Sequence, residues 1–213
     1  MEDKTQNTIA AYNKNYQQFA EKFMDYAPYV KQVEKFSGYL KDGFRLLDIG
    51  CGPGNVAKQL CAAKRLDITG IDLSEKMLEL ARQQVPQGRF YLQDSRKAVF
   101  PASSFDAIIL SFSIVHLETE AAKLLLLRAA EWLKPGGYLY VSFMEGKQAG
   151  FETTSFSQEA LYFNYFQEAA IRRLLTETQV VCIHSEKQDY PEPDGSVTTD
   201  VFLFGHKIGH YLY

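Results

Sequence analysis

The residues with the clearest potential for chemistry form a glycine-rich turn at Leu46–Gly54, with the sequence LLDIGCGPG. A short apolar run leads into this turn, and a helix-length segment follows it. Glycines at positions 50, 52 and 54 let the backbone bend sharply and approach a ligand with no Cβ atom in between. In open α/β sheets, ligands bind beyond the carboxyl ends of the strands. The motif therefore predicts a ligand-binding loop, with a purely structural tight turn as the alternative.

The spacing of the glycines also indicates which ligand the loop suits. A dinucleotide-binding GxGxxG motif would need Gly or Ala at position 55, where this chain has Asn55. Asp48 lies beside the loop and would disfavour a nearby diphosphate, because both are negatively charged. A positively charged ligand that carries an amino acid fits these residues better.

Two further carboxylates follow predicted strands and could bind an adenosine. Asp72 could accept hydrogen bonds from the two vicinal hydroxyls of a ribose, and Asp94 could accept one from an adenine amine. A solvated carboxylate at the end of a strand is the alternative in both cases. Met77 could flank the adenine as an adaptable apolar wall, or it could pack in the core of its own helix.

The segment Ser111–His116, with the sequence SFSIVH, follows the next predicted strand and should face the glycine-rich turn. Groups placed there can touch both a cofactor and a substrate. His116 is the only histidine near the predicted cleft, and its ordinary pKa suits a general base. A histidine packed at the start of a helix is the alternative.

Apolar runs and helix-length amphipathic segments alternate between residues 44 and 143. The patterns predict strands at Phe44–Ile49, Asp67–Asp72, Arg89–Leu92, Asp106–Ser111 and Tyr138–Phe143. They predict helices at Asn55–Ala63, Glu75–Gln84, Glu118–Leu133 and Gln167–Thr176. Such alternation is typical of a parallel sheet with right-handed crossovers. Gln179–His184 and Thr198–Phe204 are predicted to pair as an antiparallel hairpin around the turn-forming sequence QDYPEPDGSV.

Two aromatic segments flank this alternating region. Residues 1–43 are predicted to be helical, and their aromatic residues Tyr12, Tyr16, Phe19 and Phe23 lie three or four positions apart. The segment Glu145–Phe166 is also dense in Phe and Tyr, which indicates a lid over an apolar or planar substrate. Plain core packing is the alternative for both segments.

Taken together, these motifs resemble those of the class I S-adenosylmethionine-dependent methyltransferases, in particular small-molecule members with a generic methyltransferase domain. LLDIGCGPG, ITGIDLSEKML, FYLQDS and FDAIILSFSIVHLE are similar to the family's first four motifs, and LKPGGYLYVS is similar to the segment that leads into its fifth strand. The resemblance implies a Rossmann-like three-layer α/β sandwich. Its seven-stranded, mostly parallel sheet would have the order 3-2-1-4-5-7-6 and be closed by an antiparallel C-terminal hairpin.

The same resemblance implies S-adenosyl-L-methionine as the cofactor. It implies that the glycine loop holds the methionine part, Asp72 the ribose and Asp94 the adenine amine, with Tyr12 and Tyr16 closing over the cofactor. The cofactor-binding residues expected on this basis are Tyr16, Asp48, Gly50, Cys51, Gly52, Gly54, Asp72, Leu73, Met77, Asp94, Ser95, Ser111 and Phe112. Many amine-directed nucleic-acid methylases carry (N/D)PP(Y/F) where this chain has Ser111-Phe112-Ser113, which argues against adenine-N6 methylation.

Length and composition set the remaining expectations. The chain has 213 residues, of which 46% are hydrophobic and 23% charged, which suits one domain. We expect a single methyltransferase domain over residues 1–213, with a helical cap (1–43), a cofactor-binding core (44–143) and a lid, last helix and hairpin (144–213). A net charge of −3 without a basic run argues against a nucleic-acid partner. The polar N-terminal sequence and three cysteines without metal-ligand spacing predict a cytoplasmic protein with no membrane segment and no metal site.

Methyl transfer from a sulfonium is an in-line displacement, so proximity and orientation in a dry cavity could supply most of the catalysis. The expected acceptor is a small molecule, whose identity these patterns leave open, as they do the oligomeric state. The alternatives are an NAD(P)-dependent oxidoreductase and a non-catalytic S-adenosylmethionine-binding regulator. A protein or RNA methyltransferase is a weaker one, because no basic face or appended recognition domain is visible.

Overall fold

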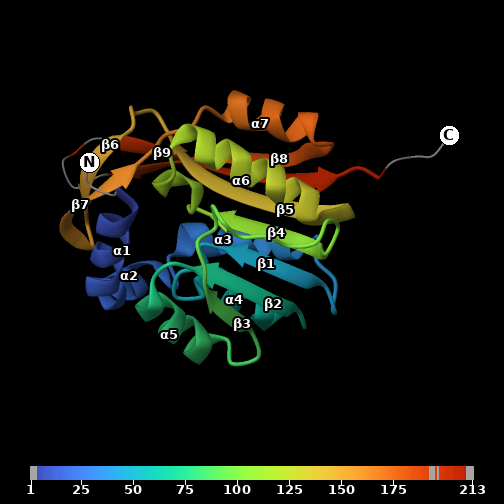
Figure 1. The fold of residues 1–213 in the computed structure, drawn as a ribbon, viewed down its shortest axis with the longest axis horizontal. Helices are drawn as coiled ribbons and strands as arrows, with labels where there is room; N and C mark the ends of the chain where they lie inside the picture. The colour runs from blue at the N-terminus through green and yellow to red at the C-terminus, as the bar shows by residue number, and fades with distance from the viewer. Residues whose placement is uncertain (1–3, 192–194, 196, 210–213) are drawn as a thin grey trace.

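A seven-stranded sheet forms the centre of the protein, as seen in a computed structural model that describes residues 4–191, 195 and 197–209 (Figure 1). Its strands are β1 (Arg45–Ile49), β2 (Asp67–Asp72), β3 (Arg89–Leu92), β4 (Phe105–Ser111), β5 (Leu133–Glu145), β8 (Val180–Pro191) and β9 (Val197–Lys207). The order is β3-β2-β1-β4-β5-β9-β8. The first five strands run parallel, and β9 pairs antiparallel with both β5 and β8. The predicted sheet, its order and its closing hairpin are therefore confirmed.

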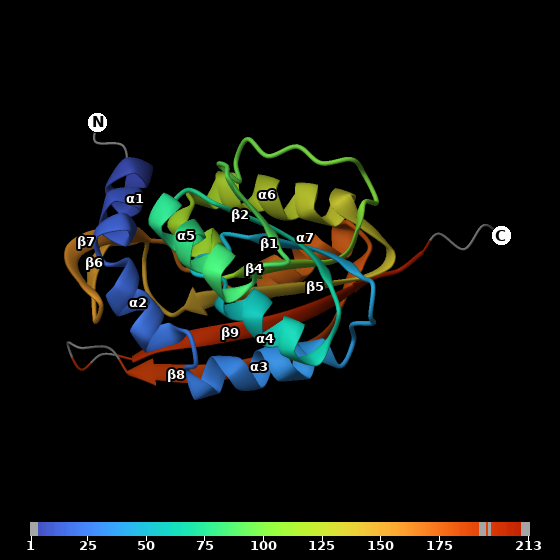
Figure 2. The same ribbon diagram turned by 90° about the horizontal axis from the view of Figure 1, so that it is seen from below.

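Five helices cover the two faces of the sheet and complete the three layers. They are α3 (Ala27–Ser37), α4 (Asn55–Ala63) and α5 (Glu75–Gln84) on one face, and α6 (Thr119–Trp132) and α7 (Glu168–Glu177) on the other (Figures 1 and 2). Adjacent residues of a strand point to opposite faces. Leu46 accordingly packs with α3, α4 and α5, whereas Leu47 packs with α6 and α7.

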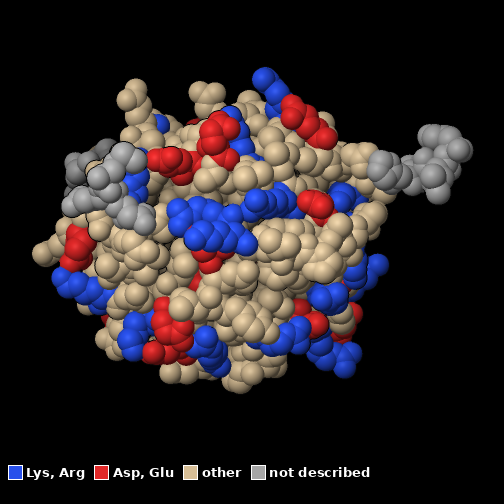
Figure 3. Space-filling model, in the orientation of Figure 1, with Lys and Arg blue, Asp and Glu red and all other residues tan. Residues whose placement is uncertain are grey.

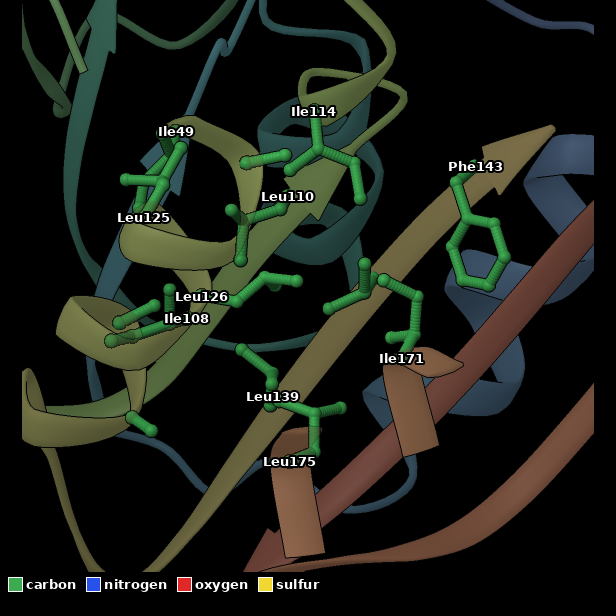
Figure 4. Close-up of a cluster of buried hydrophobic side chains, with 14 of the residues drawn as sticks. Ile49, Ile108, Leu110, Ile114, Leu125, Leu126, Leu139, Phe143, Ile171 and Leu175 are labelled. Carbon is green, nitrogen blue, oxygen red and sulfur yellow. The ribbon is translucent and has the colours of Figure 1, made fainter. Parts of the chain in front are cut away.

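Apolar strands of the parallel sheet are buried on both faces, as their near-continuous hydrophobic runs predict. Figure 4 shows the core under α6 and α7, where Ile108 and Leu139 of the sheet meet Leu126 of α6 and Leu175 of α7. All four side chains are at most 1% exposed. This packing makes the sheet a rigid base for the loops at the carboxyl ends of its strands.

The predicted boundaries agree closely with the structure in the core and less well beyond it. Strands β2 and β3 and helices α4 and α5 have the predicted ends. The C-terminal hairpin is longer than predicted, because β8 continues to Pro191 and β9 begins at Val197, inside the sequence assigned to the connection. Residues 192–194 and 196 of that connection lie outside the described residues.

A second layer of structure lies beyond the carboxyl ends of the parallel strands. It consists of α1 (Lys4–Lys14), α2 (Tyr16–Phe23) and a small antiparallel sheet of β6 (Gly150–Thr154) and β7 (Ser157–Phe163) (Figure 2). The helical N-terminal segment is as predicted, whereas the aromatic segment forms a two-stranded hairpin that the sequence patterns did not indicate. None of the helices in the described part of the chain combines the length and apolar character needed to cross a bilayer.

Candidate active site

A cavity of about 260 Å³ lies at the carboxyl ends of β1, β2 and β4, between the sheet and the N-terminal helices. The residues that line it include His116 and most of the predicted cofactor-binding residues, namely Asp48, Gly50, Cys51, Gly52, Asp72, Leu73, Met77, Asp94, Ser95, Ser111 and Phe112. Tyr16 and Gly54 are not among the lining residues. The structure therefore brings together predicted site residues that are far apart in the sequence, from Asp48 to His116.

The glycine turn has the backbone geometry that only glycine adopts readily. Gly50, Gly52 and Gly54 have φ values of 69°, 52° and 81°. A Cβ atom at Gly50 would lie 2.5 Å from Cβ of Ser113, whereas one at Gly52 would meet nothing within 4 Å. Gly50 thus permits the close approach of two loops, and Gly52 leaves its backbone open to the cavity.

Gly54 does not line the cavity but shapes the start of the helix that follows the turn. It is the N-cap of α4 and has a left-handed backbone conformation. A Cβ atom there would lie 3.1 Å from Cα of Ala81 in α5. Gly54 therefore allows α4 and α5 to pack closely beneath the turn.

Asp48 is the most unusual charged residue of the cavity. Its side chain is 1% exposed, and neither carboxylate oxygen has a hydrogen-bond partner among the described residues. Burial, together with the smaller effect of the nearby charge of Asp72, raises the pKa of Asp48 to about 7. An unsatisfied buried carboxylate is costly, so this position favours a ligand that brings a cation or N–H donors.

Asp72 connects the ends of the first two strands through its carboxylate. Its Oδ2 accepts a hydrogen bond from the Gly52 N–H at 2.9 Å, and its Oδ1 accepts one from the Ser74 N–H at 2.8 Å. Burial raises the pKa of Asp72, although the N–H groups of Ser74, Gly52 and Leu73 oppose this shift. Each oxygen retains a lone pair, so the carboxylate can still accept hydrogen bonds from a bound diol.

Asp94 is held by the neighbouring Arg96. The guanidinium Nε and Nη2 lie 2.9 and 2.7 Å from the two carboxylate oxygens, and the Arg96 N–H also donates to Oδ1. This pairing is the main reason why the pKa of Asp94 is lowered. Asp94 lines the cavity as predicted, but part of its capacity to accept hydrogen bonds is already used by Arg96.

The loop after β4 has a strained residue at its centre. Phe112 has a φ of 50°, which is rare for a residue with a Cβ atom. Its N–H donates to the carbonyl and the hydroxyl oxygens of the buried Ser142 on β5, at 3.1 and 3.0 Å. Backbone strain of this kind is often stored at functional sites. Here it turns the Phe112 ring onto Tyr29 of α3, with ring centroids 5.0 Å apart.

His116 is half-buried and hydrogen-bonded through both ring nitrogens. Its Nδ1 lies 3.0 Å from the carbonyl oxygen of Tyr162, which can only accept, so Nδ1 carries the proton. Nε2 then accepts a hydrogen bond from the Tyr12 hydroxyl at 2.8 Å. Burial lowers the pKa of His116 to about 4, so the imidazole is neutral at pH 7. The pair ties α1 to the loop that follows β4.

Two residues in or beside the cavity were not among the predicted site residues: Asp200 lines it, and Asn13 contacts the lining residue Ser74. Asn13 of α1 accepts a hydrogen bond from the Ser74 hydroxyl at 2.7 Å and so docks α1 on the N-terminus of α5. Asp200 of β9 is 2% exposed and accepts a hydrogen bond from the Tyr29 hydroxyl at 2.7 Å. Helical spacing had indicated an apolar face on α1 and α2. No sequence pattern pointed to Asn13 or Asp200, because their partners are 61 and 171 positions away.

The aromatic segments contribute side chains to the same cavity. Phe156, in the turn between β6 and β7, contacts Tyr12 and Phe19, with ring centroids 5.5 and 5.1 Å apart. Phe163 also lines the cavity, whereas Phe151 is 48% exposed. One part of the predicted lid therefore faces the cavity, and another part faces solvent.

Fold and site together define a Rossmann-like α/β protein with a nucleoside-sized cavity at the carboxyl ends of its parallel strands. Residues 46–137 match a family described as a methyltransferase domain. This match covers less than half of the chain, and the relatives described below share the same region. The core of the chain is therefore similar to methyltransferase domains.

Curated relatives share the core of the chain. Protein YqeM of Bacillus subtilis, whose name assigns it to the methyltransferases, is 36% identical over 112 residues, which are 49% of this chain and 45% of that protein. Phosphoethanolamine N-methyltransferase 2 of Caenorhabditis elegans is 30% identical over 181 residues, which are 79% of this chain and 40% of that protein. The chain thus spans less than half the length of these relatives.

Solved structures share the fold at lower identity. Magnesium protoporphyrin IX methyltransferase from Synechocystis, with bound S-adenosylmethionine, has a TM-score of 0.73 and 18% identity, covering 97% of this chain and 98% of its own. Phosphoethanolamine N-methyltransferase 2 of Haemonchus contortus, in complex with S-adenosyl-L-methionine, has a TM-score of 0.74 and 17% identity, covering 98% of this chain and 61% of its own.

Proposed function

We propose that this protein is an S-adenosylmethionine-dependent methyltransferase that acts on a small molecule. We also propose that the chain forms a single methyltransferase domain. The observation that carries the proposal is a pair of carboxylates, the buried Asp48 and the half-buried Asp72, on either side of an open glycine loop. Neither oxygen of Asp48 has a partner among the described residues. A ligand with an ammonium group and a ribose diol supplies the donors that both carboxylates can accept.

The residues present fit S-adenosylmethionine. The loop at Gly50–Gly52 and Asp48 would hold its amino-acid end, Asp72 its ribose, and Met77 and Asp94 its adenine. When bound, the cofactor supplies a methyl group made electrophilic by the adjacent sulfonium. A diphosphate would instead face the Asp48 and Asp72 charges, which disfavours a dinucleotide at the same place.

The chain itself contributes positioning and the exclusion of water. Phe112, Tyr12, Phe156 and Phe163 form apolar walls around the space beside the glycine loop. A dry, preorganised cavity holds an acceptor at near-attack distance, which alone can lower a barrier by about 7–11 kcal/mol. In this proposal His116 keeps the Tyr12 hydroxyl in place, and direct proton abstraction by its low-pKa imidazole is a secondary role.

Two features support a small acceptor and a reducing cellular location such as the cytoplasm. Figure 3 shows Lys and Arg side chains interspersed with Asp and Glu over the face in view, apart from a small basic group near its centre. Nucleic acids are bound through larger single-sign surfaces. Cys51, Cys61 and Cys182 are all free thiols, which suits a reducing compartment.

Calorimetric titration with S-adenosylhomocysteine tests the proposed cofactor. Asp72→Ala should weaken its affinity at least tenfold, because a charge-assisted pair of hydrogen bonds to the ribose is lost. Asp67→Ala is the matched control, since Asp67 is at the opposite end of the same strand and is not among the cavity-lining residues. Binding of NADH in place of S-adenosylhomocysteine would overturn the proposal in favour of an oxidoreductase.

A further inference from the structure

We infer that Asp200 and the aromatic rings around it form a subsite for a positively charged nitrogen of the acceptor, so that the substrate is an aryl or alkyl amine. This inference rests on the proposed function and adds the chemical class of the second substrate. It concerns the part of the cavity wall that β9 and β5 form through Asp200 and Met144.

Asp200 lies deep in the cavity wall on the antiparallel part of the sheet. Its carboxylate belongs to β9, opposite Met144 of β5, and both residues line the cavity. The Tyr29 hydroxyl donates to Oδ2 at 2.7 Å. A carboxylate offers about four acceptor positions, so it can receive further N–H donors from a ligand. Its burial strengthens any such interaction, because little water screens the charge.

Aromatic rings line the same cavity as Asp200. Tyr29 stacks on Phe112, at 5.0 Å between centroids, and on Phe23, at 6.0 Å with nearly parallel planes. Phe19 and Phe156 continue this wall toward Tyr12. Faces of aromatic rings attract cations through their quadrupole, and this attraction is stronger where water is excluded. A carboxylate at the end of an aromatic wall is therefore suited to an organic ammonium.

The charges of the cavity disfavour a negatively charged acceptor, such as a phosphate or a carboxylate. Among its described lining residues, Arg96 is the only Lys or Arg, and Asp94 engages it through two nitrogens. Lys22 contacts the Ser155 hydroxyl and the Tyr190 ring, and it does not itself line the cavity. Recognition of a phosphate or a carboxylate requires cationic or N–H donors. The acceptor end instead presents the carboxylate of Asp200.

The test uses the 213-residue chain, saturated with S-adenosylhomocysteine, and three series of probes in calorimetric titrations. The series are benzylamine, benzyl alcohol and benzoate; 2-phenylethylamine, 2-phenylethanol and 3-phenylpropanoate; and tryptamine, tryptophol and indole-3-propanoate. Within at least one series, the amine should bind at least about tenfold more tightly than the alcohol and the carboxylate, as expected for a charged hydrogen bond.

Two variants connect this preference to Asp200. Asp200→Asn keeps the size of the side chain and its acceptor for Tyr29, and it should reduce the amine preference to less than about threefold while the affinity for S-adenosylhomocysteine is unchanged. Asp189→Asn on the neighbouring strand removes an exposed carboxylate and should leave the preference intact. Tyr29→Phe provides a second variant in case Asp200→Asn folds poorly, and it should weaken amine binding about threefold or more.

Each outcome decides a separate point. Binding of S-adenosylhomocysteine without a preference for amines in any series overturns the amine subsite and leaves the proposed function standing. A preference that survives both Asp200→Asn and Tyr29→Phe also overturns it. Failure of the wild-type protein to bind S-adenosylhomocysteine contradicts the proposed function itself.

Discussion

At the scale of single residues, Asp48 shows a conflict between stability and binding. Its pKa of about 7 in the folded protein is above the ordinary value of 3.8, chiefly because of burial. An acid with a raised pKa contributes stability at low pH that is lost as the pH rises through the folded-state value. The ionised form is therefore costly for the fold, but it is the form that a cationic ligand requires.

This conflict predicts that the affinity for S-adenosylhomocysteine depends on pH through Asp48. Between pH 6 and pH 8, the dissociation constant of the wild-type protein should fall by up to about tenfold, because Asp48 ionises within this range. Asp48→Asn should bind more weakly at pH 8 and show a flat profile, measured by calorimetry. A wild-type profile as flat as that of Asp48→Asn would contradict the assigned role.

His116 should affect stability in the opposite direction. Its pKa is lowered from 6.5 to about 4 by burial, so its neutral form stabilises the fold. This contribution is fully present above about pH 6.5 and is lost as the pH falls toward 4, by up to about 3 kcal/mol at 1.36 kcal/mol per pH unit. The free energy of unfolding in urea should therefore fall more steeply over this range for the wild-type protein than for His116→Gln. Parallel curves for the two proteins would show that His116 titrates normally.

The role of His116 in catalysis can be tested by comparing two variants of its hydrogen bond with Tyr12. If His116 acts by holding Tyr12, then Tyr12→Phe and His116→Gln should lower turnover by similar factors. A general base would instead make His116→Gln far more damaging than Tyr12→Phe, with cofactor binding unchanged. The comparison requires initial rates with an accepted substrate, and the amine probes above provide the first candidates.

At the scale of elements, the junction between the glycine turn and α4 depends on close packing against α5. Gly54→Ala would place a methyl group 3.1 Å from Cα of Ala81 and would also require a left-handed alanine. Gly43→Ala is a matched control, because Gly43 has a φ of 83° and open space around it. Both variants should lose about 1–2 kcal/mol from strain, and Gly54→Ala about 1–3 kcal/mol more from the clash, measured by urea unfolding. Equal losses would show that α5 can move away.

The elements also show where sequence patterns are informative. Four elements were predicted with their observed ends, namely β2, β3, α4 and α5. The ends of α5 were the clearest, because Ser74 is its N-cap and Pro86 and Gly88 follow it. The β6–β7 hairpin was not predicted, because its turn at Ser155 and Phe156 lacks the Gly or Asn that usually indicates a hairpin. β8 was predicted too short because its outer half, Ser185–Pro191, is polar and pairs only with β9 at the edge of the sheet.

The site shows the same contrast between residues that local sequence patterns indicate and residues that only the packing of the fold brings together. Gly50 and Asp72 were predicted to lie at the cavity, and they line it, because the sheet brings the carboxyl ends of parallel strands together. Asp200 was missed because it lies in the middle of a strand, where alternation indicates only a face. Its partner Tyr29 comes from a helix 171 positions away, and that proximity depends on the packing of the whole fold.

At the scale of the whole molecule, the cavity is closed by elements that are distant in sequence. Thr8 and Tyr12 of α1 and Phe156 of the β6–β7 turn line it together with loops of the main sheet. α1 is held to this site by the hydrogen bonds of Tyr12 to His116 and of Ser74 to Asn13. A ligand in the cavity therefore contacts the cap and the sheet at once, which should couple binding to the stability of the cap.

This coupling predicts a pattern in hydrogen exchange. At 100 times its dissociation constant, S-adenosylhomocysteine should stabilise the protein by about 2.7 kcal/mol and raise its melting temperature by about 5–10 °C. Amides of α1 and β7 should exchange more slowly with the ligand, because opening the cap would then require its release. The amides at the buried centres of β1 and β4 serve as the internal reference, since they open only with the whole fold. Added protection confined to Gly50–Gly54 and Asp72, with α1 unchanged, would mean that the cap does not take part in binding.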